Sequence, residues 1–179
     1  MGPNSTVSVL LTCPRWAVVC PAAENLAREA AQCALIDGSA ASGFAWQGRL
    51  ELGVMLTDAA EQQRLNHDYR GCDAPTNVLA FPAWDPQVRP APGAPLLLGD
   101  VVLAFEPVAC EAREEHKPLA DHLRHLVVHG VLHLLGYDHL SEREAAEMEA
   151  LETSILAKMG VPDPYRDTMS FIESEPAKP

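Results

Sequence analysis

Six of the seven histidines lie between residues 116 and 139, and three of them are spaced as ligands of one metal ion would be. His129 and His133 are four residues apart, so a helix places both imidazoles on one face with their Cβ atoms about 6 Å apart. Gly136 allows a sharp turn after that helix, which lets His139 return toward the pair. Three imidazoles leave a fourth position open for water or substrate, as in catalytic zinc sites. The spacing predicts a metal centre with His129, His133 and His139 as its ligands.

The same spacing occurs in metalloproteases, but this segment lacks their general base. The intervals from His129 to His133, Gly136 and His139 match the pattern His-Glu-x-x-His-x-x-Gly-x-x-His, in which the Glu is the general base. Gly130 stands at the position of that Glu. A bound metal can still lower the pKa of water and polarise an oxyanion. The site is therefore expected to be hydrolytic without being proteolytic.

His125 competes with His139 for the role of third ligand, because it precedes His129 by four residues. It is eight residues from His133, or about 12 Å along a helix axis, and one ion with bonds of about 2 Å cannot reach both. His139 is therefore preferred. His125 is expected to pack in the protein or face solvent, with a contact to one of the ligands as the alternative.

A phosphodiester is one substrate that such a site can hydrolyse, and a cation would then be needed to hold the phosphate. Arginine is suited to this role because its planar guanidinium group donates two parallel hydrogen bonds. Arg70 lies in the segment 66–82, at the predicted turn between a helix and a strand, from which its side chain can project toward a cleft. Arg70 is therefore the candidate phosphate-binding residue.

Short strands are predicted around these residues where apolar and polar residues alternate or β-branched residues cluster. They span residues 7–11, 50–56, 77–81 and 96–105, the last interrupted at Gly99–Asp100. Five prolines between Pro82 and Pro95 predict a stiff exposed loop, with a proline-recognition motif as the alternative.

Helices are predicted where apolar residues recur at helical spacing and capping residues precede them. They span residues 21–36, ending at Asp37-Gly38, then about 58–70, 118–136 and 141–160. The last should bury a stripe of apolar side chains: Ala145, Met148, Leu151, Ile155 and Met159. Its acidic residues are expected at the surface, well away from the cleft: Glu142, Glu144, Glu147, Glu149 and Glu152.

The order strand–helix–strand–helix–strand–strand–helix–helix indicates one layered domain of the α+β class. We expect a small mixed sheet of about four strands packed with about five helices, over residues 1–165. The metal site would lie on a C-terminal helix and the turn after it. Residues 166–179 are predicted to form a loose tail.

The charge limits the partners of the chain. Its 179 residues include 13 Lys and Arg and 25 Asp and Glu, for a net charge of −12. This argues against broad electrostatic coating of nucleic acid or of an anionic membrane. A local basic cleft on an acidic body is still compatible with that charge, and Arg64, Arg70 and Arg124 lie in or near the motif segments.

The cellular location is predicted from what the sequence lacks. Its five cysteines are widely spaced and form no C-x-x-C motif, which favours reduced thiols. The first residues do not read as a signal peptide, and no stretch is long and apolar enough for a transmembrane helix. A cytoplasmic protein is therefore expected.

The histidine segment resembles the signature of a known family. Residues 129–139 read His-Gly-Val-Leu-His-Leu-Leu-Gly-Tyr-Asp-His, similar to the H-G-x-L-H-L-x-G-Y-D-H motif of the YbeY metal-dependent endoribonucleases. Residues 69–82 resemble the family's Y-R-x-x-D-x-P-T-x-V-L-S-F-P segment, and residues 98–102 its L-G-D-I-x-I strand. The similarity covers roughly residues 45 to 160. Ala80 replaces the usual Ser before Phe81.

The resemblance implies a three-histidine site for one divalent ion, usually zinc, held by His129, His133 and His139, with Arg70 in the cleft. It implies cleavage of single-stranded RNA, maturation of the 3′ end of small-subunit rRNA, and ribosome quality control. Partners would be rRNA and the small ribosomal subunit or its assembly proteins, without a membrane. Three imidazoles also accept nickel or copper.

The general base stays open between Asp138, Asp100 and a mechanism that uses the 2′-hydroxyl group of the RNA. Two other functions are alternatives to the nuclease. One is a non-catalytic ribosome-assembly factor with a structural metal. The other is a metalloprotease-like hydrolase, which Gly130 disfavours.

Overall fold

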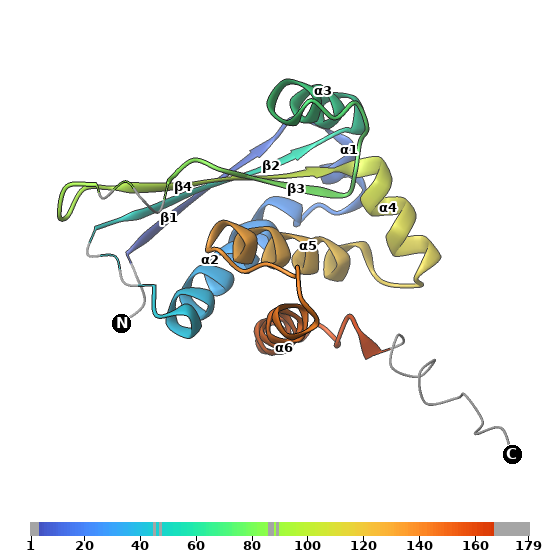
Figure 1. Cartoon of the computed structure of the whole chain (residues 1–179). Coiled ribbons are helices and arrows are strands. Elements are labelled where there is room, and N and C mark those ends of the chain that lie inside the picture. Colours follow the sequence, from blue (N-terminus) through green and yellow to red (C-terminus); the bar gives the residue numbers. More distant parts are fainter. Residues whose placement is uncertain (1–3, 45, 47, 86–87, 89, 167–179) are drawn as a thin grey trace, which may run out of the picture.

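A four-stranded mixed sheet forms one layer of the molecule, and most helices pack beneath it (Figure 1). The computed structural model describes residues 4–44, 46, 48–85, 88 and 90–166. Strands β1, β2 and β4 run parallel, and β3 lies antiparallel to β4 at one edge. In spatial order the strands are β1 (Ser5–Leu11), β2 (Leu50–Thr57), β4 (Leu96–Ala104) and β3 (Val78–Pro82).

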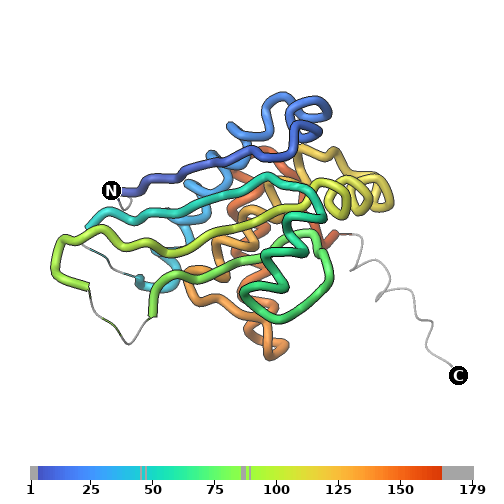
Figure 2. Tube along the Cα trace, turned by 90° about the horizontal axis from the view of Figure 1, so that it is seen from above, coloured from blue at the N-terminus to red at the C-terminus, as the bar shows by residue number. Residues whose placement is uncertain are grey.

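The described residues form six helices, which cover the two faces of the sheet unequally. Helices α2, α5 and α6 lie on one face, whereas α3 lies across the other, as the view from above in Figure 2 shows. Among the described helices, none is both long and apolar enough to cross a membrane. The helices are α1 (Arg15–Val19), α2 (Ala23–Ser42), α3 (Ala59–Arg70), α4 (Phe105–Glu114), α5 (Leu119–Leu134) and α6 (Glu142–Lys158).

This architecture confirms the predicted α+β class and the four-stranded mixed sheet, with one helix more than expected. The predicted alternation of apolar residues in β2 is observed as alternating burial. Every second residue is at most 2% exposed: Leu50, Leu52, Val54 and Leu56. Capping also follows the sequence. Asp58 accepts a hydrogen bond from the backbone of Glu61, and Ser141 forms a reciprocal capping box with Glu144.

Helix α5 is the centre of the core. It contacts α2, α4, α6 and both strands at the β3 edge of the sheet. Its buried residues lie on most sides of the helix, which is typical of a helix enclosed by others. Pro118 is its N-cap residue rather than its first helical residue, one position from the prediction.

The first long helix extends further than the sequence predicts. Asp37-Gly38 does not end α2, which continues to Ser42 and ends at Gly43 in the left-handed conformation. Gly38 lies inside the helix because α5 packs closely there. A Cβ atom at residue 38 would be 2.7 Å from Leu135 Cδ1 and 2.8 Å from Leu132 Cδ2. Gly38 is therefore the residue at which α2 and α5 cross. The sequence around a glycine does not by itself distinguish such a crossing from the end of a helix.

Two helices and a strand irregularity also differ from the prediction. Neither α1 nor α4 is among the predicted helices, although Phe105, Val108 and Ala112 form a buried helical stripe in α4. Strand β4 is not interrupted at Gly99–Asp100. Its pairing with β2 instead shifts by one residue, because Leu97 pairs with Glu51 while Gly99 pairs with Leu52. This bulge keeps the strand continuous.

The proline-rich segment 82–95 is anchored more firmly than predicted. Pro82 belongs to β3, and Pro86 lies outside the described residues. Trp84 is half-buried, and its indole Nε1 donates a hydrogen bond to the carbonyl oxygen of Leu134 at 3.3 Å. The segment therefore begins against the C-terminal end of α5.

Gly130 sets how closely α5 approaches β4, and its substitution tests that contact. A Cβ atom at residue 130 would lie 2.6 Å from Cγ1 and 3.1 Å from Cγ2 of Val101. Alanine gains about 1 kcal/mol in helix propensity, but overpacking costs about 1–3 kcal/mol. We expect Gly130→Ala to lower the free energy of unfolding, measured in urea on the metal-free protein.

A double-mutant cycle with Val101→Ala provides the control for this expectation. Removing the Val101 methyl groups opens the space that the new Cβ atom needs, so Gly130→Ala should no longer destabilise the protein in that background. Equal or greater stability of the single variant Gly130→Ala would contradict the close contact.

Candidate metal centre

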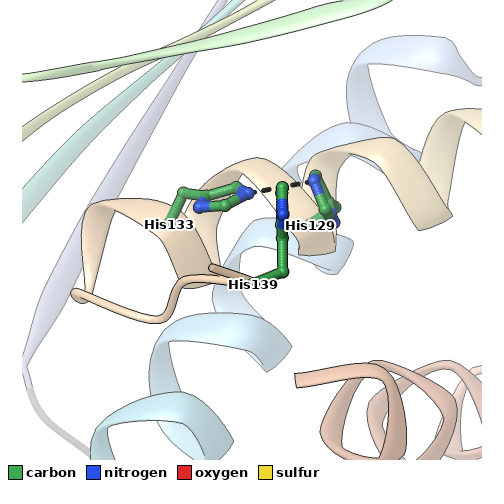
Figure 3. A group of neighbouring side chains, drawn as sticks. All are labelled: His129, His133 and His139. Atoms are coloured by element: carbon green, nitrogen blue, oxygen red, sulfur yellow. Dashed lines mark hydrogen bonds between the residues drawn. The ribbon is translucent and has the colours of Figure 1, made fainter. Parts of the chain in front are cut away.

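Helix α5 holds His129 and His133 one turn apart on the face that borders a cleft (Figure 3). Their Nε2 atoms are 3.0 Å apart, and their ring centroids are 4.5 Å apart. Both side chains are half-buried, so the surrounding protein limits their movement while leaving the ring edges accessible.

The turn after α5 brings His139 back to this pair. Gly136 has a φ of +94°, a conformation that side chains disfavour. The hydroxyl group of Tyr137 donates to the carbonyl oxygen of Gly38 in α2 at 3.0 Å, which fixes the turn on the core. The ring of His139 lies 5.0 Å from that of His133 and 5.9 Å from that of His129, centroid to centroid.

The three side chains fit one metal ion. One ligand atom from each of His129, His133 and His139 can be chosen so that all lie within 4.8 Å of one another. Ligands about 2 Å from a tetrahedral ion are themselves about 3.3 Å apart, close to the observed separation of the two Nε2 atoms. Across the described residues, no other group of three His, Cys, Asp or Glu side chains meets this criterion.

Hydrogen bonds at the Nδ1 atoms leave the Nε2 atoms, which face each other at 3.0 Å, as the atoms that could bind a metal. The Nδ1 atom of His133 lies 2.9 Å from the carbonyl oxygen of Tyr137, which can only accept, so Nδ1 carries the proton. The Nδ1 atom of His129 lies 2.5 Å from Oε1 of Glu152. Burial, with His129 and His139 nearby, lowers the pKa of His133 and favours the neutral imidazole that metals require.

A cleft of about 390 Å³ adjoins the histidines, and Arg70 is among the residues that line it. Arg70 is the last residue of α3, on the other face of the sheet, and it reaches the cleft at the β3 edge. Its Nη2 donates to the carbonyl oxygen of Ala80 at 2.5 Å, and its guanidinium lies 5.2 Å from the centre of the Phe81 ring. The structure thus brings Arg70 into the same cleft as His129, His133 and His139.

The other basic residues singled out in the sequence lie elsewhere. Arg64 pairs with Glu61 and Asp68 on α3, and Arg124 pairs with Asp121 on α5. Neither is among the described residues that line the cleft. Arg70 is therefore the one of the three that could meet a substrate phosphate.

The two acidic candidates for a general base are separated. Asp138 lines the cleft, and its Oδ1 accepts a hydrogen bond from the backbone of His139 at 2.8 Å. Asp100 projects over Gly53, whereas its neighbour Val101 contacts α5. Because successive strand residues face opposite sides, Asp100 points away from the cleft.

His125 does not join the three histidines as a ligand group. Its Nε2 lies 3.3 Å from the hydroxyl oxygen of Tyr165 and 3.5 Å from Oε2 of Glu152. It is thus partly buried as expected, and it touches the residue behind His129.

The position of Glu152 differs from the prediction. It was expected among the surface acids of the last helix, but it is fully buried and contacts His129. The signal was present, because Glu152 lies four residues after Met148 and three before Ile155, on the predicted apolar stripe. A carboxylate on such a stripe calls for a buried partner.

The fold and the site together define a class: α+β proteins in which three histidines, from a core helix and its following turn, face an open cleft and could hold one metal ion. The chain belongs to the YbeY family, because the family model described as "Endoribonuclease YbeY" matches residues 21–160. This result confirms the resemblance read from the histidine segment.

Relatives match over most of the chain. A protein of Paramagnetospirillum magneticum named "Endoribonuclease YbeY" is 52% identical over 161 residues, which cover 89% of this chain and 94% of that protein. One of the same name from Rhodopseudomonas palustris is 47% identical over 170 residues, covering 93% and 87%. The solution structure of TM1509 from Thermotoga maritima has a TM-score of 0.53, 22% identity and coverage of 97% and 100%, which supports the fold.

Metal content tests the ligand set directly. We expect the wild-type chain, loaded with Zn²⁺ and desalted, to retain one equivalent, and the variants His129→Ala, His133→Ala and His139→Ala each to lose most of it. Each substitution removes one of only three protein ligands. His67→Ala is the matched control, because His67 is exposed on α3. Mass-spectrometric metal analysis gives the result, and full retention by any of the three variants would exclude that histidine as a ligand.

Proposed function

We propose that this chain is a metal-dependent endoribonuclease that cuts single-stranded RNA, acting in maturation of the 3′ end of small-subunit rRNA and in ribosome quality control. One observation carries the proposal: three imidazoles suited to one ion and an arginine suited to a phosphate line the same cleft. Membership of a family described as endoribonucleases supports the reaction class.

His129, His133 and His139 would hold the ion, with Zn²⁺ as the best match to three nitrogen ligands and an open fourth position. When bound, such an ion supplies Lewis acidity and lowers the pKa of water. Arg70 would hold the phosphate, since its guanidinium is kept in place by the Ala80 carbonyl oxygen and the Phe81 ring.

The surface beside Arg70 supports a preference for single strands. The side chain of Tyr69 is exposed, at 74%, and its ring centre lies 5.5 Å from that of Phe81. An exposed aromatic ring can stack on an unpaired base, whereas bases in a duplex are already stacked. Tyr69 stands next to Arg70 in the chain, so a base and its neighbouring phosphate could be held together.

The low basic content supports a role for protein partners in targeting. With a net charge of −12 and Arg70 as the one arginine or lysine among the described cleft residues, affinity for free RNA should be weak. We propose that proteins of the small ribosomal subunit or its assembly bring the enzyme to rRNA in the cytoplasm. The catalytic domain would span residues 1–165.

A cleavage assay tests the proposed reaction. We expect purified protein with Zn²⁺ to cut a single-stranded RNA and to spare a duplex of the same sequence. His133→Ala or a chelator should abolish cleavage, and His67→Ala should preserve it. Equal cleavage by His133→Ala would mean that the activity is a contaminant, and inactivity of the metal-loaded wild type would favour an assembly factor with a structural metal.

Arg70 offers a separate test of phosphate binding. Loss of a charge-assisted hydrogen bond costs about 1.5–3 kcal/mol, so Arg70→Ala should lower kcat/KM for RNA by about 10–100-fold. Metal content should not change, because Arg70 contacts none of the three histidines in the structure. Arg64→Ala, on the same helix but outside the described cleft lining, is the control. A similar loss in both variants would point to general electrostatics instead.

A further inference from the structure

A fully buried carboxylate lies directly behind the candidate metal centre. Glu152 is on α6, and none of its surface is exposed. Its Oε1 lies 2.5 Å from Nδ1 of His129, on the side of the ring opposite the Nε2 atom that faces His133. This contact joins α6 to α5 through one of the three histidines.

The second carboxylate oxygen is also held. The hydroxyl group of Tyr165 donates to Oε2, and Nε2 of His125 lies 3.5 Å from it. Burial and the nearby charge of Glu152 raise the pKa of Tyr165 well above its usual range, so its hydroxyl group remains a donor. The carboxylate of Glu152 is therefore fixed in position by residues that are not among the three histidines.

The charge of Glu152 needs a cationic counterpart. An unpaired buried carboxylate is strongly unfavourable. Within the described part of the chain, no lysine or arginine pairs with Glu152, and its charged contacts are to His125 and His129 alone. Both carboxylate oxygens face groups that can donate: Oε1 faces Nδ1 of His129, and Oε2 faces the hydroxyl group of Tyr165 and Nε2 of His125. The carboxylate thus lies one imidazole away from the place proposed for a dication.

We propose that Glu152 is a positioning residue of the metal centre. Its carboxylate holds the Nδ1–H group of His129, so that Nε2 of the same ring faces the ion. The ion in turn offsets the buried negative charge of Glu152. The inference rests on the metal centre of the proposed function. With Glu152 ionised, only a proton on Nδ1 allows the 2.5 Å contact, and the lone pair of His129 is then on Nε2. Carboxylate partners of this kind orient metal-binding histidines and increase their basicity.

The two helical histidines are oriented by unlike partners. His133 donates from Nδ1 to a neutral backbone carbonyl oxygen, that of Tyr137, whereas His129 donates to a full negative charge. A carboxylate strengthens the electron donation of its imidazole more than a carbonyl group does. His129 would therefore be the strongest of the two donors toward the ion.

A purely structural role of Glu152 makes a different prediction for metal affinity. If Glu152 only links α5 and α6, removing its charge should destabilise the metal-free protein and leave metal affinity unchanged. If it serves the ion, neutralising its charge should lower metal affinity, whatever the change does to the metal-free protein.

The test is Glu152→Gln, which keeps the shape of the side chain and removes the charge. We expect the Kd for Zn²⁺, from competition with a chromophoric chelator, to rise about 10–100-fold. The increase in Tm on adding Zn²⁺ should shrink as well. Glu147→Gln is the matched control, because it removes the same charge from an exposed position on the same helix.

The outcomes separate this inference from the function on which it rests. If the Kd of Glu152→Gln for Zn²⁺ is within about twofold of the wild-type value, the positioning role is overturned. The proposed function is still supported in that case, provided that the wild-type protein binds zinc and cleaves RNA. A lower Tm without metal and an unchanged Kd also overturn it, in favour of a structural link. Failure of the wild type to bind Zn²⁺ would instead reject the metal centre itself.

A second variant decides the question should Glu152→Gln fail to fold. Glu152→Met fills a similar volume with an apolar side chain, a replacement that buried charges often tolerate. A folded Glu152→Met protein with weakened Zn²⁺ binding supports the proposal. One that binds Zn²⁺ as tightly as wild type overturns it.

Discussion

The close contact between α5 and the sheet at Gly130 and Val101 is the constraint on which the site depends. It presses the helix that carries His129 and His133 against β4, so the two imidazoles have a fixed height relative to the β3 edge. The same contact explains why no glutamate stands next to the first histidine, as it would in a protease. Any side chain at residue 130 first meets the methyl groups of Val101. The glycine at residue 130 and the placement of the two histidines thus have one steric cause.

Around this helix, each histidine is held by a different part of the fold. His129 is tied to α6 through Glu152, His133 to the following turn through Tyr137, and His139 lies in that turn. Tyr137 in turn bonds to α2 through the carbonyl oxygen of Gly38. A metal ion at this place would connect these elements around α5, so ion binding and tertiary stability should be coupled.

Features with local causes could be predicted from the sequence. The histidine triplet, the capping residues Asp58 and Ser141, and the alternation in β2 all depend on spacing within one segment. Features with distant causes could not. Gly38 reads as a helix end until α5 is known to cross it, and Glu152 reads as one more surface acid until His129 is placed beside it. The position of Arg70 required the order of the strands, because it reaches the cleft only where β3 is an edge.

The edge position of β3 has a consequence for solubility as well as for the site. An edge strand presents unpaired backbone groups that can pair with another chain. Here Arg70 donates a hydrogen bond to the carbonyl oxygen of Ala80, and Pro82 has no backbone N–H group that could pair with another strand. The strand that forms one wall of the cleft is thereby protected from adding a foreign strand, and the side chain that protects it also lines the cleft.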